Sequence, residues 1–215
     1  RKSVGEAMSI GRTFKEALQK GLRSMEIGAT GLGYSFRSEL PDRETILESL
    51  HRPNSRRMFS LRQALVAGIS EEEIFAVSAI DPWFIRQVRD IVEMEKRISN
   101  FGLANDMTTA NKALADMLRE AKEYGFSDRQ LAEMWKMAEA DIRRMRKEMD
   151  VEPTYYLVDT CAAEFEAYTP YFYSTYERGD EIKIEDRRKV LILGGGPNRI
   201  GQGIEFDYCC VHAPF

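Results

Sequence analysis

The sequence predicts a mainly α-helical fold with two related helix-turn-helix units, followed by the truncated strand-and-helix start of an α/β domain. Three observations predict this fold. Apolar residues recur at spacings of three and four through much of residues 13–149. A serine-led capping pattern at residues 70–74 returns 57 positions later, at residues 127–131. Near the C-terminus, the apolar run of residues 189–193 leads into the glycine run of residues 194–203, which is typical of a buried parallel strand that turns into a helix.

Length and composition are those of a soluble globular protein. The chain has 215 residues, 31% of them charged, and a formal net charge of -4. This balance gives no bulk attraction to nucleic acid or to an anionic membrane. No apolar run approaches the roughly 20 residues that cross a bilayer, and no signal peptide is visible. We therefore expect a cytoplasmic protein whose partners are proteins, with Cys161, Cys209 and Cys210 reduced.

Both ends of the sequence suggest a piece of a longer protein. The first residue is Arg1 rather than Met, and a recognisable pattern is already under way at residues 3–6. At the other end, only twelve residues follow Gly203, whereas an α/β domain needs several more strands and helices to cover its sheet. We expect that the α/β domain continues beyond this chain.

The first third of the chain predicts three helices. Residues 13–25 form an amphipathic pattern, with Thr13 or Ser9 as the N-cap. Three glycines in residues 27–33 then predict a loop, which we interpret as a domain boundary. Two further helices are expected at residues 43–50 and 55–67.

The middle of the chain contains the two helix-turn-helix units. In each unit a serine, Ser70 or Ser127, is placed to cap a helix, and Glu73 or Gln130 stands where its side chain can return the hydrogen bond. The offset of 57 also relates pairs such as Ile74 and Leu131, Ile85 and Ile142, and Arg89 and Arg146. The units are expected at residues 71–79 with 82–100 and at residues 128–137 with 139–149, separated by a helix at residues 109–124.

The chain changes character after Pro153. Aromatic and β-branched residues in 155–158 and 168–176 favour extended or irregular structure. Residues 179–188 are strongly charged and predict a surface linker that runs into the strand of residues 189–193.

The glycine run is a candidate phosphate cradle, because backbone N–H groups at the start of a helix bind anions. Gly196 and Gly201 have P-loop spacing, but Gln202-Gly203 stands where a P-loop needs Lys and Ser or Thr. The dinucleotide pattern would require glycine at position 199, where Arg199 stands. We favour glycines that let a helix pack closely on a strand over direct nucleotide contact.

A DNA-binding helix-turn-helix regulator is the alternative function. In that interpretation Arg143, Arg144, Arg146 and Lys147 lie on the recognition helix. The negative net charge and the acidic residues of the first unit favour a solvated face on an architectural helix pair.

No catalytic, cofactor-binding or metal-binding residue is predicted. His51 and His212 lack the spacing of metal ligands, and no histidine lies near Cys161 in the sequence to activate it as a nucleophile. A small buried thiol is the better interpretation of Cys161. Four methionines at helical spacing are expected in the core or at an interface: Met134, Met137, Met145 and Met149.

Three long motifs resemble the large subunit of carbamoyl phosphate synthetases. They are KSVGEAMSIGRTF at residues 2–14, VDTCAAEF at residues 158–165 and LGGGPNRIGQGIEFDY at residues 193–208. The resemblance implies three parts. Residues 1–26 would end the first, carboxyphosphate-forming ATP-grasp half, residues 27–178 would form the helical oligomerisation domain with its exit segment, and residues 179–215 would begin the second half, in its pre-ATP-grasp region.

The resemblance also implies a parent enzyme, an ATP-dependent ligase. It would make carbamoyl phosphate from bicarbonate, glutamine-derived ammonia and two ATP, for arginine and pyrimidine biosynthesis, with Mg²⁺ or Mn²⁺ neutralising the transferred phosphoryl groups. In the family those sites lie outside the region that these motifs span, so no functional residue is carried over and no cofactor is expected in this chain. The implied partners are the flanking synthetase halves, other large subunits and a glutaminase small subunit, without nucleic acid or membrane. Trp83 or Trp135 could anchor the contact between subunits.

Overall fold

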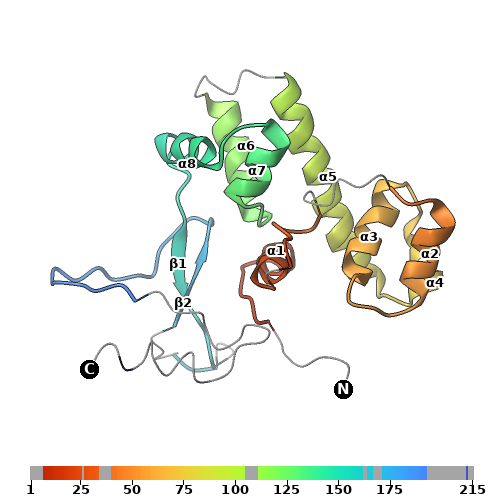
Figure 1. Cartoon of the computed structure of the whole chain (residues 1–215). Coiled ribbons are helices and arrows are strands. Elements are labelled where there is room, and N and C mark those ends of the chain that lie inside the picture. The colour runs from red at the N-terminus through yellow and green to blue at the C-terminus, as the bar shows by residue number, and fades with distance from the viewer. Residues whose placement is uncertain are drawn as a thin grey trace.

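The computed structural model describes residues 7–25, 27–33, 40–104, 111–161, 164–166, 171–192 and 212. Two groups of helices, α2–α4 and α6–α8, lie on either side of the long helix α5, and helix α1 lies between them (Figure 1). A two-stranded sheet follows the last helix. The described elements are α1 (Phe14–Ser24), α2 (Arg43–His51), α3 (Arg57–Val66), α4 (Glu71–Ser78), α5 (Pro82–Ala104), α6 (Lys112–Glu123), α7 (Asp128–Trp135), α8 (Glu139–Glu148), β1 (Thr154–Leu157) and β2 (Phe172–Thr175).

The internal repeat is confirmed and is longer than the sequence predicted. Helices α4–α5 and α7–α8 are the two expected helix-turn-helix units, and the same offset of 57 positions in the sequence also aligns α3 with α6. We therefore call α3–α5 the first repeat and α6–α8 the second repeat. Ala79 and Lys136, 57 positions apart, both take left-handed backbone conformations after the second helix of their repeat, at φ 53° and 55°. Matched positions are fully buried in both repeats: Leu61 and Leu118, Ala64 and Ala121, Ile74 and Leu131, Ile85 and Ile142.

The serine caps also form as predicted, with one difference between the repeats. The hydroxyl of Ser70 accepts from the N–H of Glu73 at 3.2 Å, and that of Ser127 accepts from the N–H of Gln130 at 3.1 Å. Gln130 completes the box, because its Oε1 accepts from the N–H of Ser127 at 2.9 Å. Glu73 instead turns to α2, where its carboxylate lies 2.5 Å from the guanidinium of Arg43. The first repeat therefore lacks the second hydrogen bond of the capping box, and its Glu73 side chain contacts another helix.

The glycine loop at residues 27–33 is packed into the helical body. Leu32 is buried, and its N–H donates to Oε1 of Gln19 in α1 at 3.2 Å. The hydroxyl of Ser127 donates to the carbonyl of Thr30 at 3.3 Å. The glycines of this loop predicted a domain boundary. In the structure the loop contacts both α1 and the start of α7.

The two tryptophans occupy different environments. Trp135 is 9% exposed, and its indole N–H donates to the carbonyl of Ile98 at 2.8 Å. Trp83 is 45% exposed at the start of α5. The expected core role of the methionines is confirmed for Met134 and Met145, which are buried; Met137 and Met149 pack partly buried against the same core.

The extended structure predicted after Pro153 is confirmed as an antiparallel sheet, β1–β2, in which Thr154 pairs with Thr175 and Leu157 with Phe172. The following charged segment is exposed, yet it is bonded to the sheet. Glu181 donates its N–H to the carbonyl of Tyr155 at 2.9 Å and accepts from the N–H of Leu157 through its carboxylate at 2.7 Å. The outer edge of β1 is therefore covered by side chain and backbone of this segment.

The strand expected at residues 189–193 does not form in its described part. Residues 189–192 have no regular structure, and Val190 and Leu191 are exposed. The prediction required neighbouring strands to bond its backbone, and no described segment pairs with it. Leu193 and the glycine run of residues 194–203 lie outside the described residues. In the described part of the chain, none of the helices combines the length and apolar character needed to cross a membrane.

Candidate functional site

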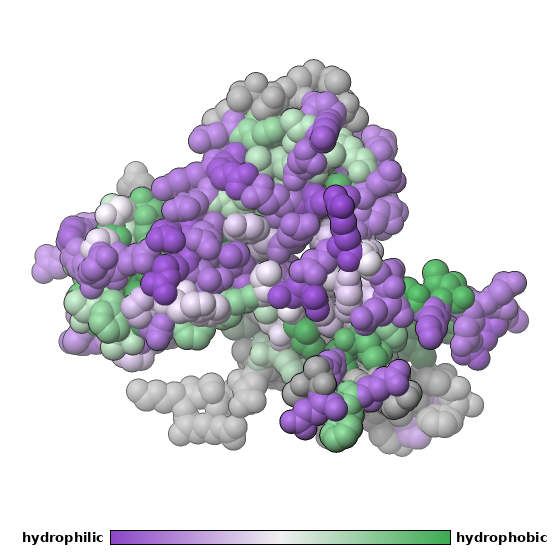
Figure 2. All heavy atoms as spheres, turned by 180° about the vertical axis from the view of Figure 1, so that it is seen from behind, coloured by the Kyte–Doolittle hydropathy of each residue, from purple (hydrophilic) through white to green (hydrophobic). Residues whose placement is uncertain are grey.

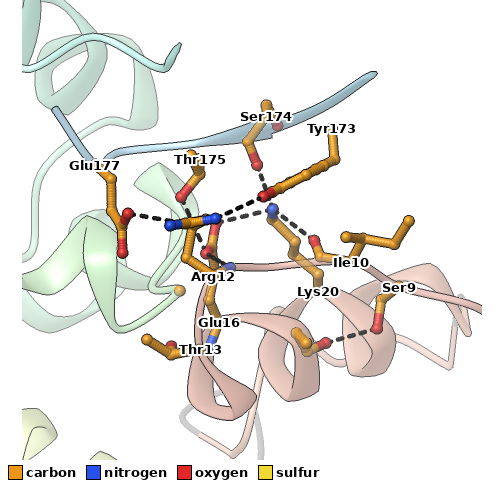
Figure 3. Close-up of polar contacts among 12 residues, drawn as sticks. Ser9, Ile10, Arg12, Thr13, Glu16, Lys20, Tyr173, Ser174, Thr175 and Glu177 are labelled. Atoms are coloured by element: carbon orange, nitrogen blue, oxygen red, sulfur yellow. Dashed lines mark hydrogen bonds and ion pairs between the residues drawn. The ribbon is translucent and has the colours of Figure 1, made fainter. Parts of the chain in front are cut away.

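A buried carboxylate joins α1 to the β1–β2 sheet (Figure 3). Thr13 caps α1, and this places Glu16 in the first turn, where its side chain is only 2% exposed. Its Oε2 accepts from the N–H of Arg12 at 2.8 Å and from the hydroxyl of Thr175 in β2 at 3.1 Å. Its Oε1 lies 2.8 Å from Nζ of Lys20, one turn further along the helix.

The ammonium of Lys20 extends this network on both sides. It donates to the carbonyl of Ile10, before α1, at 2.9 Å and to the carbonyl of Ser174, in β2, at 2.5 Å. Arg12 adds an outer layer: its guanidinium bonds Glu177 at 2.8 Å and lies over the ring of Tyr156 at 5.1 Å. We call the set Arg12, Glu16, Lys20, Thr175 and Glu177 the joint.

The joint ties together the segment that leads into the helices and the strand that leaves them. Residues 9–12 come before α1, whereas residues 174–177 come after the last helix. Charge-assisted hydrogen bonds in a buried site are stronger and more directional than those at the surface. The network therefore fixes these two segments relative to each other.

A second buried cluster attaches the same sheet to the second repeat. Asp128, at the start of α7, accepts from Nζ of Lys122 at 2.9 Å and from Nε of Arg146 through both oxygens, at 3.1 and 2.9 Å. The ring of Tyr176 lies 4.9 Å from the Lys122 ammonium and 5.8 Å from the Arg146 guanidinium. Arg23 of α1 donates to the carbonyl of Gly125 at 2.7 Å nearby.

Burial sets the protonation behaviour of this cluster. It lowers the pKa of Lys122 from 10.5 to about 8, although Asp128 opposes the shift, because a charged ammonium is poorly solvated there. Burial also raises the pKa of Tyr176 to about 12. For Asp128, burial favours the neutral acid, but Lys122 and Arg146 outweigh it and hold the pKa below its usual value.

The first repeat carries the counterpart of this ion pair. Arg89 bonds Glu71, and both residues stand 57 positions before Arg146 and Asp128. The first pair is more open, since Arg89 is 40% exposed and Arg146 only 8%. An arginine on the last helix and an acid at the start of the middle helix are thus part of how each repeat is held together.

The sequence did not predict the joint. Helix α1 was expected to bury apolar residues, yet the most buried side chains of the helix are Glu16, Gln19 and Leu22. Gln19 donates to the carbonyl of Tyr124 at 3.0 Å and accepts from Gln130 at 3.0 Å. The available signal was the spacing of Glu16, Gln19 and Leu22, which places two polar residues on the same helix face as a core leucine.

The residues weighed for DNA binding mostly have acidic partners within the chain. Arg146 is buried against Asp128. Arg144 lies 2.9 Å from Asp141, and Lys147 lies 3.9 Å from Glu152. Arg143 is exposed. The proposed recognition helix is therefore committed in part to internal contacts.

The other candidates are not brought together. The Nδ1 atom of His51 lies 3.4 Å from the carbonyl of Val77 at the surface, and His212 is exposed. Cys161 is a free thiol that is only partly buried, whereas the sequence predicted a buried one. Its N–H donates to Asp159 in an exposed turn. Within the described residues, no group of three or more His, Cys, Asp or Glu side chains is arranged to hold a metal. Cys209 and Cys210 lie outside the described residues.

The fold and the joint together define a helical scaffold domain, in which the buried charges hold the molecule's own segments in place. The chain belongs to the carbamoyl-phosphate synthetase large chain oligomerisation domain family, whose model matches residues 6–150. A second model, that of the carbamoyl phosphate synthase preATP-grasp domain, matches residues 186–215.

Curated relatives align with the whole of this chain. A carbamoyl phosphate synthase large chain of Archaeoglobus fulgidus is 50% identical over 214 residues, which are 100% of this chain and 20% of that protein. Those of Nostoc sp. and Synechocystis sp. are 50% and 51% identical, and each is covered to 19%. The chain therefore spans about a fifth of the length of these relatives.

Proposed function

We propose that this chain is the connecting and self-associating region of a glutamine-dependent carbamoyl phosphate synthase large chain. The parent protein would make carbamoyl phosphate from bicarbonate, glutamine-derived ammonia and two ATP, with Mg²⁺ or Mn²⁺, in the cytoplasm. It would use a glutaminase small subunit as the ammonia source. The identity of about 50% to large chains along the full length supports this assignment.

Within that parent, the chain would link the end of the first synthetase half to the beginning of the second. The sequence placed the boundaries at residues 26/27 and 178/179. The family match from residue 6 and the packing of the 27–33 loop on α1 favour an earlier first boundary, so we propose that α1 belongs to the helical domain. The oligomerisation-domain match ends at residue 150 and the preATP-grasp match begins at residue 186, so we propose that the second boundary lies between these positions.

The joint is the observation that carries the connecting function. Residues 9–12 and 174–177, separated by the whole helical body, are bonded to the same buried Glu16–Lys20 pair. Whatever precedes and follows these segments is therefore held at one place. Replacing Glu16 by Leu should free β2, because Lys20 and Thr175 lose their shared partner.

Hydrogen exchange tests this directly. In the Glu16→Leu variant, amides of residues 172–175 should exchange at least tenfold faster, while those of α7 and α8 keep their protection. Glu44→Leu, at an exposed position of α2, is the matched control. Unchanged exchange in β2 would show that the joint does not hold the strand.

A separate assay for bicarbonate-dependent ATP hydrolysis should find none in the 215-residue chain, and activity there would overturn the assignment of the chemistry to other regions.

For self-association we propose the aromatic surface around Trp83. Its ring lies 5.3 Å from Phe14 and 4.9 Å from Phe84, and both Trp83 and Phe84 are exposed. Exposed tryptophan flanked by aromatic residues is typical of the centre of a protein interface. Trp135 is excluded from this role because it is buried in the core.

Light scattering on the Trp83→Ala variant checks the proposal. The average mass at a fixed concentration should fall, while circular dichroism shows unchanged helicity. Phe75→Ala on α4, which is similarly exposed, should leave the mass unchanged. An unaltered mass for Trp83→Ala would place the association surface elsewhere.

A further inference from the structure

Charged side chains are buried where the sheet meets the second repeat. Hydrophilic residues cover much of the helical body in Figure 2, and charged side chains normally stay at such a surface. Lys122 and Arg146 are instead only 6% exposed. Among the described residues, Asp128 supplies the only carboxylate bonded to either of them. Positive charge is therefore in excess at a place that water does not reach freely.

The first residue after β2 covers these charges. The ring of Tyr176 lies 4.9 Å from the Lys122 ammonium and 5.8 Å from the Arg146 guanidinium. A ring attracts a nearby cation, but it also displaces the water that would solvate it. Thr175, one position earlier, bonds Glu16 in α1. The strand is therefore attached at two neighbouring points, to α1 through Thr175 and to the second repeat through Tyr176.

The surroundings of the Lys122 ammonium oppose its charge. Burial is the largest effect and lowers the pKa of Lys122 from 10.5 to about 8. Asp128 of α7 acts against this shift, whereas Arg146 of α8 and Arg23 of α1 add to it by repulsion. Further titratable groups act on these neighbours: Glu16 on Arg23, Glu152 on Arg146, and Tyr155 on Tyr176.

We propose that Lys122 and Tyr176 form a proton-sensitive latch, in which proton uptake by the lysine favours detachment of residues 174–177 from the second repeat. When the ring of Tyr176 leaves, water reaches the ammonium and solvates it. The detached state therefore binds the proton more tightly than the attached state does. Because linkage is reciprocal, binding of the proton favours the detached state to the same extent.

The latch closes as the pH rises. Below pH 8 Lys122 is charged in both states, so the balance between them does not depend on this proton. Between pH 8 and 10.5 the detached state alone keeps the proton, and attachment gains about tenfold for each pH unit. Above pH 10 the ionisation of Tyr176, whose pKa is about 12 when attached, acts in the opposite direction.

An NMR titration of the 215-residue chain tests the coupling. The chemical shift of the Lys122 Cε atom, assigned with a Lys122→Arg variant, gives the pKa of this lysine. Tyr176→Ala should raise that pKa by about one pH unit or more, because water then reaches the ammonium. Tyr171→Ala removes an exposed ring ahead of β2 and should leave the pKa at about 8. The proposal is wrong if Tyr176→Ala leaves the pKa unchanged.

Hydrogen exchange gives a second test that keeps the ring in place. After correction for intrinsic rates, the protection of amides in residues 172–175 should rise at least tenfold between about pH 7.5 and 9.5. In Lys122→Met it should stay constant. Amides of α2, which lies on the other side of α5 from the second repeat (Figure 1), should show no rise in either protein. The latch is excluded if protection does not rise, if the rise persists in Lys122→Met, or if α2 shares it.

Discussion

Two glycines at matched positions in the repeats have the same backbone conformation but different surroundings. Gly68 and Gly125 both end the first helix of their repeat with positive φ, 78° and 85°. A Cβ on Gly68 would meet nothing within 4 Å, whereas one on Gly125 would lie 2.9 Å from Cα of Glu16 in α1. The same turn is therefore free in the first repeat and covered by α1 in the second.

Alanine substitutions at these glycines should differ in cost. Gly68→Ala should destabilise by about 1 kcal/mol, the cost of a left-handed alanine. Gly125→Ala should cost about 2 kcal/mol more, since the backbone of α1 must move. Urea denaturation of both variants measures the difference. Equal losses would mean that α1 is not held against this turn.

The buried charge cluster makes stability depend on pH. Between pH 8 and 10.5 the unfolded chain keeps a proton on Lys122 that the folded chain has lost, so stability rises with pH. Above pH 10 the unfolded Tyr176 ionises before the folded one, whose pKa is about 12, and stability falls. The free energy of unfolding should rise by about 3 kcal/mol before the ionisation of Tyr176 begins to offset it.

Melting temperatures between pH 7 and 11 should show this maximum in the wild-type chain. Lys122→Met removes the titrating ammonium and should flatten the rise. Lys147→Met, on an exposed part of α8, should leave it in place. The explanation would be wrong if Lys122→Met kept the full rise.

At the scale of elements, both repeats contain the same arginine–carboxylate ion pair, which is more deeply buried in the second repeat than in the first. The arginine of the last helix bonds the acid that opens the middle helix in both repeats. In the second repeat Arg146 also donates to the carbonyl of Val151 at 3.1 Å, and Tyr176 lies beside its guanidinium. In the first repeat the pair lies near the surface.

Removing these arginines should therefore have unequal effects. Arg146→Met leaves a buried carboxylate with fewer partners and should cost about 3 kcal/mol. Arg89→Met removes a partly exposed pair and should cost less than about 1 kcal/mol. Chemical denaturation of the two variants gives the comparison. A larger loss for Arg89→Met would contradict the assignment of burial.

Most of the helices could be predicted because their signals are local. Ser70, Ser127 and the apolar spacing around them locate helix starts to within a residue or two. The extension of the repeat to α3 and α6 was also visible in the sequence, through Leu61 with Leu118 and Gly68 with Gly125.

The joint could not be predicted in the same way. Glu16 and Thr175 are 159 positions apart, and a buried carboxylate on an otherwise amphipathic helix gives no local signal of its distant partner. The failure at residues 189–192 has the opposite cause. Their sequence favours a strand, but strand formation depends on neighbours that no described segment supplies.

At the scale of the whole molecule, the helices share one core, and the sheet lies at its edge. One continuous core runs from Leu22 in α1 through both repeats to Val151. The sheet contributes buried polar contacts on one face and exposed apolar residues on the other. The joint therefore fastens one face of the sheet to α1.

The closeness of the incoming and outgoing segments has a consequence for how such a domain could be gained or lost. The carbonyls of Ile10 and Ser174 accept from one lysine ammonium, so the chain enters and leaves the helical body at nearly the same place. A unit attached in this way can be spliced into a host, or exchanged for a relative, without forcing the host's flanking parts apart. Residues 9–177 carry the whole joint, so transplanting them between relatives of this chain should exchange the helical body while leaving the relative positions of the host's flanking parts almost unchanged.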